Sequence, residues 1–164
     1  MASGNPVDVP RTFEIGLVMA GSISAGAYIA GVVDFLIQAL DQWEQAKSGS
    51  DPDCPRHNLL LKVMAGASGG GITAAIAAGQ LGQAFSPVTS LPTIPSPVNN
   101  KFFESWVERI DIAGLLGTRD LDADPQSDVQ SVLDSTVLDR IAASVFVFPV
   151  GSPPVNRKYL ADPL

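Results

Sequence analysis

Cysteine and histidine are almost absent from this 164-residue chain, which has Cys54 and His57 and no second copy of either. A single cysteine excludes an internal disulfide and fits a reducing compartment. With no Cys-x-x-Cys pair, a Cys/His zinc site is also excluded. Both residues lie in a proline-rich stretch at positions 51–57, which favours a solvent-exposed loop over a two-ligand metal site. We therefore expect no metal.

Positive charge is also scarce: ten Lys and Arg face 17 Asp and Glu, a formal net charge of −7 and a pI near 4.4. Nucleic-acid binding needs a basic surface that displaces counterions, so we exclude it. The negative net charge does not attract anionic lipids either. A lipid would therefore have to bind through apolar surface. The 46% hydrophobic content suits one folded domain.

Long uncharged runs are limited to residues 15–33, a length that could span a bilayer. Four glycines and two serines interrupt this run, and it has no basic flank beyond Arg11. The first residues lack the positive start of a signal peptide. We therefore predict a folded segment here rather than a membrane span, and a cytoplasmic or peripheral membrane location.

The order of the predicted elements indicates an α/β fold. Residues 13–19 and 59–65 are apolar and rich in β-branched or aliphatic side chains, typical of buried strands. A Gly/Ser-rich turn and a helical pattern follow each. The helical stripe after the first turn consists of Ile29, Val32, Val33, Leu36, Leu40 and Trp43. The second helix presents Ile72, Ala75, Ile76 and Gly79. Two such units predict a parallel central sheet with flanking helices.

The second half of the chain has fewer regular signals. Residues 85–100 and 111–126 lack a period and predict loops, whereas residues 102–110 and 129–145 predict amphipathic helices, the second opened by a capping box at 127–130. Alternating aspartates at 120, 122 and 124 resemble a calcium loop without its glycine and glutamate, so a solvated acidic loop is favoured. Asp34 is expected at the surface.

The sequence Gly-Ala-Ser-Gly-Gly at positions 66–70 is a G-x-S-x-G motif on a predicted strand-to-helix turn. This is the arrangement of a nucleophile elbow, in which a sharp turn exposes the serine hydroxyl. Ser68 is the candidate nucleophile. Gly66 and Gly70 would allow the strand and helix to approach closely. The Gly69 amide would point to where an oxyanion forms.

The first turn, at residues 21–26, ends the first strand and opens the first helix. In a parallel sheet it lies beside the Ser68 turn, at the edge where ligands bind. Amides at a helix start attract anions, so Gly21, Ser22 and Ile23 are candidates to hold an oxyanion or a phosphate. The turn is not a Walker A loop, and no G-x-G-x-x-G opens either unit. We expect no nucleotide cofactor.

A serine nucleophile needs a base, and His57 precedes the second strand while Ser68 follows it. A seven-residue strand separates the two by roughly 20 Å, which excludes a Ser-His-Asp triad within one chain. The remaining choice is a dyad in which a carboxylate contacts Ser68. Asp111, just after a predicted helix, is a minor candidate.

Together, a Gly-rich turn after the first strand, G-x-S-x-G after the second and no usable histidine resemble the patatin-like phospholipase family. Residues 17–36 and 63–81 carry the resemblance; residues 106–142 resemble bacterial patatin-related proteins less specifically. The resemblance implies that Ser68 is the nucleophile and that Gly21, Ser22 and Ile23 form the oxyanion hole. It also implies lipid acyl hydrolysis by a Ser-Asp dyad without metal or other cofactor.

The sequence departs from that family twice. Ala25 stands where the family commonly has a basic residue, and the chain contains no Asp-Gly, although the family's aspartate lies in a D-G-[GA] motif. We therefore expect residues 1–164 to be the N-terminal part of such a domain, lacking the aspartate and nearly inactive alone. The expected partner is a lipid ester at a membrane surface.

Two other hypotheses stay open. One is a catalytically silent module that holds a lipid or a phosphate at the two helix starts. The other is a membrane-inserted hairpin of residues 15–40 and 59–81. The oligomeric state does not follow from the sequence.

Overall fold

The structure is a computed structural model that describes residues 12–22, 25–89, 99–122, 132–148, 154–162 and 164. Its elements are β1 (Thr12–Met19), α1 (Gly26–Lys47), β2 (Asn58–Gly66), α2 (Gly69–Gln80), α3 (Lys101–Phe103), the π-helix η1 (Glu104–Arg109), α4 (Ile112–Leu115), α5 (Arg119–Asp122) and α6 (Thr136–Val145). The chain is an α/β protein, and both predicted strand–turn–helix units are present.

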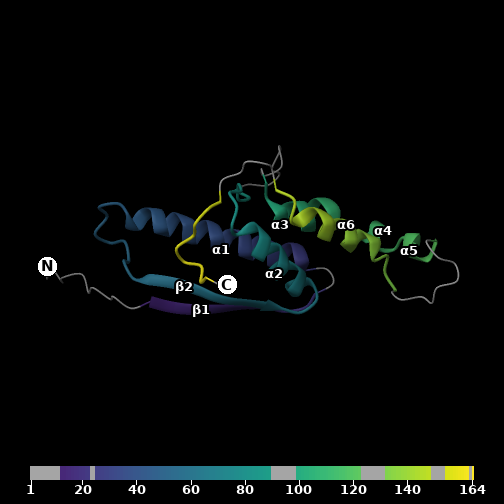
Figure 1. Cartoon of the computed structure of the whole chain (residues 1–164), viewed down its shortest axis with the longest axis horizontal. Coiled ribbons are helices and arrows are strands. Elements are labelled where there is room, and N and C mark those ends of the chain that lie inside the picture. The colour runs from purple at the N-terminus through teal and green to yellow at the C-terminus, as the bar shows by residue number, and fades with distance from the viewer. Residues whose placement is uncertain (1–11, 23–24, 90–98, 123–131, 149–153, 163) are drawn as a thin grey trace.

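The two strands pair in parallel along their whole length, from Thr12 opposite Asn58 to Met19 opposite Gly66. An irregularity after Ile15 shifts the register by one residue. Figure 1 shows α1 and α2 on the same side of this strand pair, with α3 and α6 beyond them. Because the strands are parallel, the two Gly-rich turns that follow them come together at one end of the sheet.

The last residues of the chain lie against the other edge of β2. The Leu61 N–H donates to the Tyr159 carbonyl (2.7 Å), and the Ala161 N–H donates to the Leu61 carbonyl (3.0 Å). Arg157 anchors this segment: its guanidinium donates to both carboxylate oxygens of Asp41, at 3.1 to 3.2 Å. The segment therefore extends the hydrogen-bonded edge of the sheet, and Leu61 is fully buried.

The hydrophobic core lies between the strand pair and the helices. Its largest buried apolar side chains are Val33, Ile37, Ile76, Leu81, Phe102 and Tyr159.

The stripe predicted for α1 is partly wrong: Val32 is exposed, whereas Ile37 and Asp34 are buried. Helix α1 contacts α2, α3 and η1, and the surface it buries against them is rotated relative to the predicted stripe. The prediction that Asp34 lies at the surface is therefore wrong, and its burial is described with the site below.

Helix α2 likewise buries Thr73, Ala77 and Gln80 and leaves Ala75 exposed, contrary to prediction. Thr73 is accommodated because its hydroxyl donates to the Gly69 carbonyl (2.9 Å). A small-residue helix gives little amphipathic contrast, which explains the error.

Two predictions fail in the second half of the chain. The sequence predicts a loop at residues 111–126, but this stretch contains the short helices α4 and α5. The last helix begins at Thr136, later than predicted, and Val132 is almost fully exposed. The capping box at 127–130 and the side chains at 120, 122 and 124 lie outside what the structure describes. Among the described residues, no His, Cys, Asp and Glu group could hold a metal ion.

No helix within the described ranges combines the length and the apolar character that crossing a membrane requires.

Candidate functional site

Ser68 occupies the turn between β2 and α2 in a backbone conformation that side chains rarely adopt, with φ 49° and ψ −123°. A residue with a Cβ in such a conformation costs about 1–3 kcal/mol, and such costs cluster at functional sites. The side chain is exposed and makes no capping hydrogen bond. The turn thus holds the Ser68 hydroxyl away from its own backbone and open to solvent.

Two glycines permit this turn because other backbone atoms occupy the space of their side chains. A Cβ on Gly66 would lie 2.5 Å from the Gly70 carbonyl oxygen, and one on Gly70 would lie 2.7 Å from the Ala20 carbonyl oxygen. Real Cβ atoms do not approach so closely. Strand β2 and the start of α2 therefore make the close approach that the motif predicts, and the start of α2 also touches the end of β1.

The first Gly-rich turn lies directly beside Ser68. A Cβ built on Gly21 would be 3.4 Å from the Ser68 Cβ and 3.4 Å from the Ala67 carbonyl oxygen. The two turns are joined by the Ala67 N–H, which donates to the Met19 carbonyl (3.2 Å). A Cβ at position 21 would thus be in ordinary van der Waals contact with Ser68, and glycine leaves that space beside the serine unfilled.

Ser22 shapes this first turn through its side chain. Its hydroxyl oxygen accepts a hydrogen bond from the Ala25 N–H (2.7 Å), which satisfies one of the donors at the start of α1. Its carbonyl oxygen lies 2.7 Å from where a Gly69 Cβ would stand. The Ser22 hydroxyl is therefore committed to the turn, which leaves backbone groups to face a ligand. Ile23, the third predicted residue of this turn, lies outside the described residues.

Gly69 is the first residue of α2 and is buried. The N–H of the first residue of a helix has no acceptor within that helix, and the helix dipole makes this end electropositive. The next N–H, on Gly70, already donates to the Ala67 carbonyl (2.9 Å). Gly69 thus offers a backbone donor adjacent to the Ser68 hydroxyl.

Trp106 of η1 packs behind the turns, and sequence reasoning did not assign it to the site. Its six-membered ring occupies the space of a Gly26 side chain and lies 3.4 Å from where a Gly69 Cβ would be. The indole, 8% exposed, thus contacts the starts of both α1 and α2. A glycine at a helix start is the only local signal for this contact, and it does not reveal the partner.

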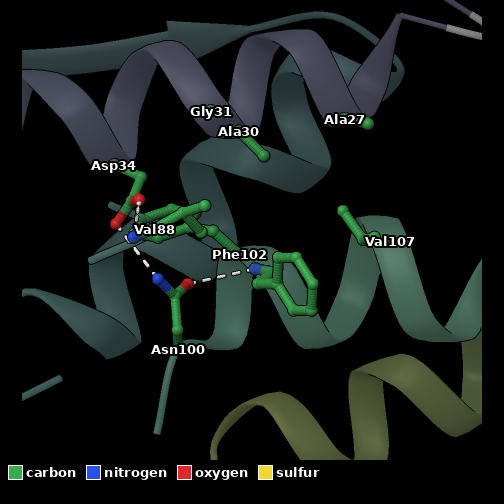
Figure 2. A pocket seen from close by; sticks show the side chains of 9 residues that line it. Ala27, Ala30, Gly31, Asp34, Val88, Asn100, Phe102 and Val107 are labelled. Carbon is green, nitrogen blue, oxygen red and sulfur yellow. Dashed lines mark hydrogen bonds between the residues drawn. The ribbon is translucent and has the colours of Figure 1, made fainter. Parts of the chain in front are cut away.

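An apolar pocket of about 260 Å³ opens next to this tryptophan, between α1 and the α3–η1 segment. Ala27, Ala30 and Gly31 form one wall, and Phe102 and Val107 form the other. Figure 2 shows Ala27 and Val107 at one end of the pocket, with Asp34 and Asn100 at the other. Ala27 follows Gly26 and Val107 follows Trp106 in the chain, and neither Ser68 nor Gly69 lines the pocket.

The far end of the pocket is closed by a buried polar group. The Asp34 carboxylate accepts hydrogen bonds from the Val88 N–H (2.8 Å) and from the Asn100 side-chain amide (3.1 Å). The side-chain oxygen of Asn100 in turn accepts a hydrogen bond from the Phe103 N–H (3.0 Å), which caps α3. Burial raises the pKa of Asp34, and the two hydrogen bonds oppose that rise. These contacts explain how a carboxylate can be buried there.

The structure separates the other candidate acid–base groups from Ser68. His57 precedes β2, and its ring packs at a tilt of 55° against the Trp43 ring, with 4.8 Å between the ring centroids. Ser68 follows β2, so His57 and Ser68 lie at opposite ends of the strand. Asp111 accepts from the Gly114 N–H (2.7 Å) and caps α4. Neither residue contacts Ser68.

The fold and the site thus define an α/β protein in which a strained serine turn meets a second Gly-rich turn. The "Uncharacterized protein y4iI" of Sinorhizobium fredii (strain NBRC 101917 / NGR234) is 45% identical to this chain over an alignment of 141 residues, which covers 80% of this chain and 20% of that protein. The chain therefore spans about one fifth of the length of the relative it matches. No family model and no solved structure matches the chain.

Proposed function

We propose that this segment carries the nucleophile and the oxyanion-binding turn of a serine lipid acyl hydrolase of the patatin-like type. The observation that carries the proposal is the conformation of Ser68, φ 49° and ψ −123°, beside a Gly21 on which a built Cβ would lie 3.4 Å from the Ser68 Cβ. A turn that served only to cap a helix would need neither feature.

In the proposed reaction, the Ser68 hydroxyl attacks the carbonyl carbon of an ester, and a base takes the hydroxyl proton. The negative charge that develops on the carbonyl oxygen would be stabilised by backbone donors of Gly69 and of the first turn at Gly21 and Ser22. In other hydrolases, loss of one such donor raises the activation free energy by about 3 kcal/mol. The exposure of Ser68 and the electropositive start of α2 support these roles.

The apolar pocket supports a lipid as the substrate. It is lined almost wholly by carbon, with Ala30, Gly31 and Phe102 in its walls, and its lining includes Ala27 and Val107, the residues that follow Gly26 and Trp106 in the chain. An acyl chain whose ester lies at Ser68 could enter it and gain free energy by burial. The resemblance to patatin-like proteins is the second support for this substrate class.

The base is the part of the proposal that needs residues beyond the described ranges. A Ser-Asp dyad requires a carboxylate in contact with the Ser68 hydroxyl, and within the described ranges no hydrogen bond joins that hydroxyl to an acid. The same observation favours the alternative function, a catalytically silent module that binds a lipid or a phosphate at the two helix starts.

Ester hydrolysis by a full-length protein that contains this segment tests the proposal. We expect hydrolysis of a short-chain fatty-acid ester that falls by roughly 10³-fold or more in Ser68→Ala. Ser135→Ala, which also removes an exposed serine at a helix start, should keep the wild-type rate. The 164-residue chain alone should hydrolyse the ester at close to the background rate. Full activity in Ser68→Ala would refute the proposal, and no activity in any form would favour the silent module.

A further inference from the structure

A second pocket, distant in sequence from Ser68, gathers three of the chain's ten basic residues. Arg109 at the end of η1, Arg119 at the start of α5 and Arg140 on α6 line a cavity of about 300 Å³. Val137 and Ile141 of α6, both buried, form its apolar floor. Three arginines from three separate elements thus line one space, in a protein whose net charge is −7.

Much of the hydrogen-bonding capacity of these arginines is unused within the described part of the chain. Arg109 pairs with Glu104 through one terminal nitrogen. Arg140 donates its Nε–H to the Thr136 carbonyl (3.2 Å), which leaves both terminal nitrogens. Arg119 interacts electrostatically with Asp134 but forms no ion pair within 4 Å with a described residue. Each guanidinium has five N–H donors, so several remain for a ligand.

One acid also lines the pocket. The Asp111 carboxylate accepts the Gly114 N–H (2.7 Å) and so is partly engaged by its own helix. Three arginines and one aspartate give the lining a formal charge of +2. The ion pair of Arg109 with Glu104, and the electrostatic attraction between Arg119 and the buried Asp134, reduce this field. We therefore expect the pocket to prefer a ligand that forms directional hydrogen bonds. An anion held by charge alone should bind less well.

We propose that this pocket binds a phosphate group. Arginine forks match phosphate oxygens in geometry and form charge-assisted hydrogen bonds with them. A cavity of about 300 Å³ is at the lower end of the range for small-molecule sites, and its apolar floor leaves room for a substituent on the phosphate. The phosphate can belong to a lipid headgroup or to a soluble ester. The site does not involve Ser68 and does not rest on the hydrolase proposal.

Titration of ¹⁵N-labelled protein with inorganic phosphate, observed at the arginine Nε–Hε signals, tests the site without any variant. We expect saturable shifts of the Arg109, Arg119 and Arg140 signals. Arg119→Gln and Arg140→Gln should each weaken binding about tenfold. Lys62→Gln, which removes one exposed positive charge from the sheet, should bind like wild type, and so should Ser68→Ala.

Co-sedimentation with phosphatidic acid vesicles identifies the source of the phosphate. Vesicle binding that is lost in Arg119→Gln and Arg140→Gln assigns the pocket to a lipid headgroup. Phosphate binding without vesicle binding assigns it to a soluble ester. Absence of saturable shifts in the wild type, or equal weakening by Lys62→Gln, would overturn the proposal. Because the wild-type signals report binding directly, the test remains decisive even where an arginine variant fails to fold.

Discussion

Replacing Ser68 by glycine should stabilise the protein, although glycine usually destabilises one. The reason is the positive φ of Ser68, which a residue with a Cβ adopts at a cost of about 1–3 kcal/mol and glycine adopts freely. Against this gain, glycine makes the unfolded chain more flexible, which costs about 0.4–1 kcal/mol. The Ser68 side chain is exposed and caps nothing, so its loss adds little.

The net expectation is a gain of about 1 kcal/mol in the free energy of unfolding for Ser68→Gly. For a protein of this size, that corresponds to a rise in Tm of roughly 2–4 °C. Ser68→Ala keeps a Cβ in the same backbone conformation and should stay within about 0.5 kcal/mol of wild type. Urea denaturation followed by circular dichroism measures the free energy of unfolding of wild type, Ser68→Gly and Ser68→Ala.

Ser135 provides the matched control. It is also an exposed serine at a helix start without a side-chain cap, but its φ is −71°. Ser135→Gly should therefore lose about 0.5–1 kcal/mol. If Ser68→Gly were less stable than Ser68→Ala, the turn would hold no strain, and the main structural support for the nucleophile would be lost.

Two further substitutions test the packing around the site. Gly70→Ala should cost about 3 kcal/mol of unfolding free energy because its Cβ would meet backbone, whereas Gly82→Ala, with no atom within 4 Å, should cost little; thermal melting separates them. Asp34→Ala should cost about 2 kcal/mol at pH 7, because two hydrogen-bond donors lose their acceptor. Burial raises the pKa of Asp34, so the folded protein holds that proton more tightly than the unfolded chain. This contribution to stability is complete below pH 3.8 and is lost as pH rises through the raised pKa. Stability curves of wild type and Asp34→Ala should differ in slope above pH 3.8, and parallel curves would contradict this account.

Local patterns were enough to predict the two strand–turn–helix units, because each signal lies within about ten residues of its neighbours. The exposed turn at Ser68 follows from the glycine spacing at 66–70 together with the predicted strand before it and helix after it. Its geometric relation to Gly21 follows from one added rule, that parallel strands end at the same edge of a sheet.

The remaining features depend on contacts between distant parts of the chain. Asp34 is buried because Asn100, 66 residues later, supplies a donor, and the edge of β2 is covered because Arg157 reaches Asp41, 116 residues earlier. No periodicity in one segment encodes such partners. Trp106 behind the helix starts belongs to the same class, and so does the pocket that three arginines share.

The most direct measurement of the central claim is the site at which a fluorophosphonate attaches to a full-length protein that contains this segment. Peptide mapping by mass spectrometry should place a single adduct on Ser68, absent from Ser68→Ala and retained in Ser135→Ala. An adduct on another serine, or equal labelling of Ser68→Ala, would contradict the account.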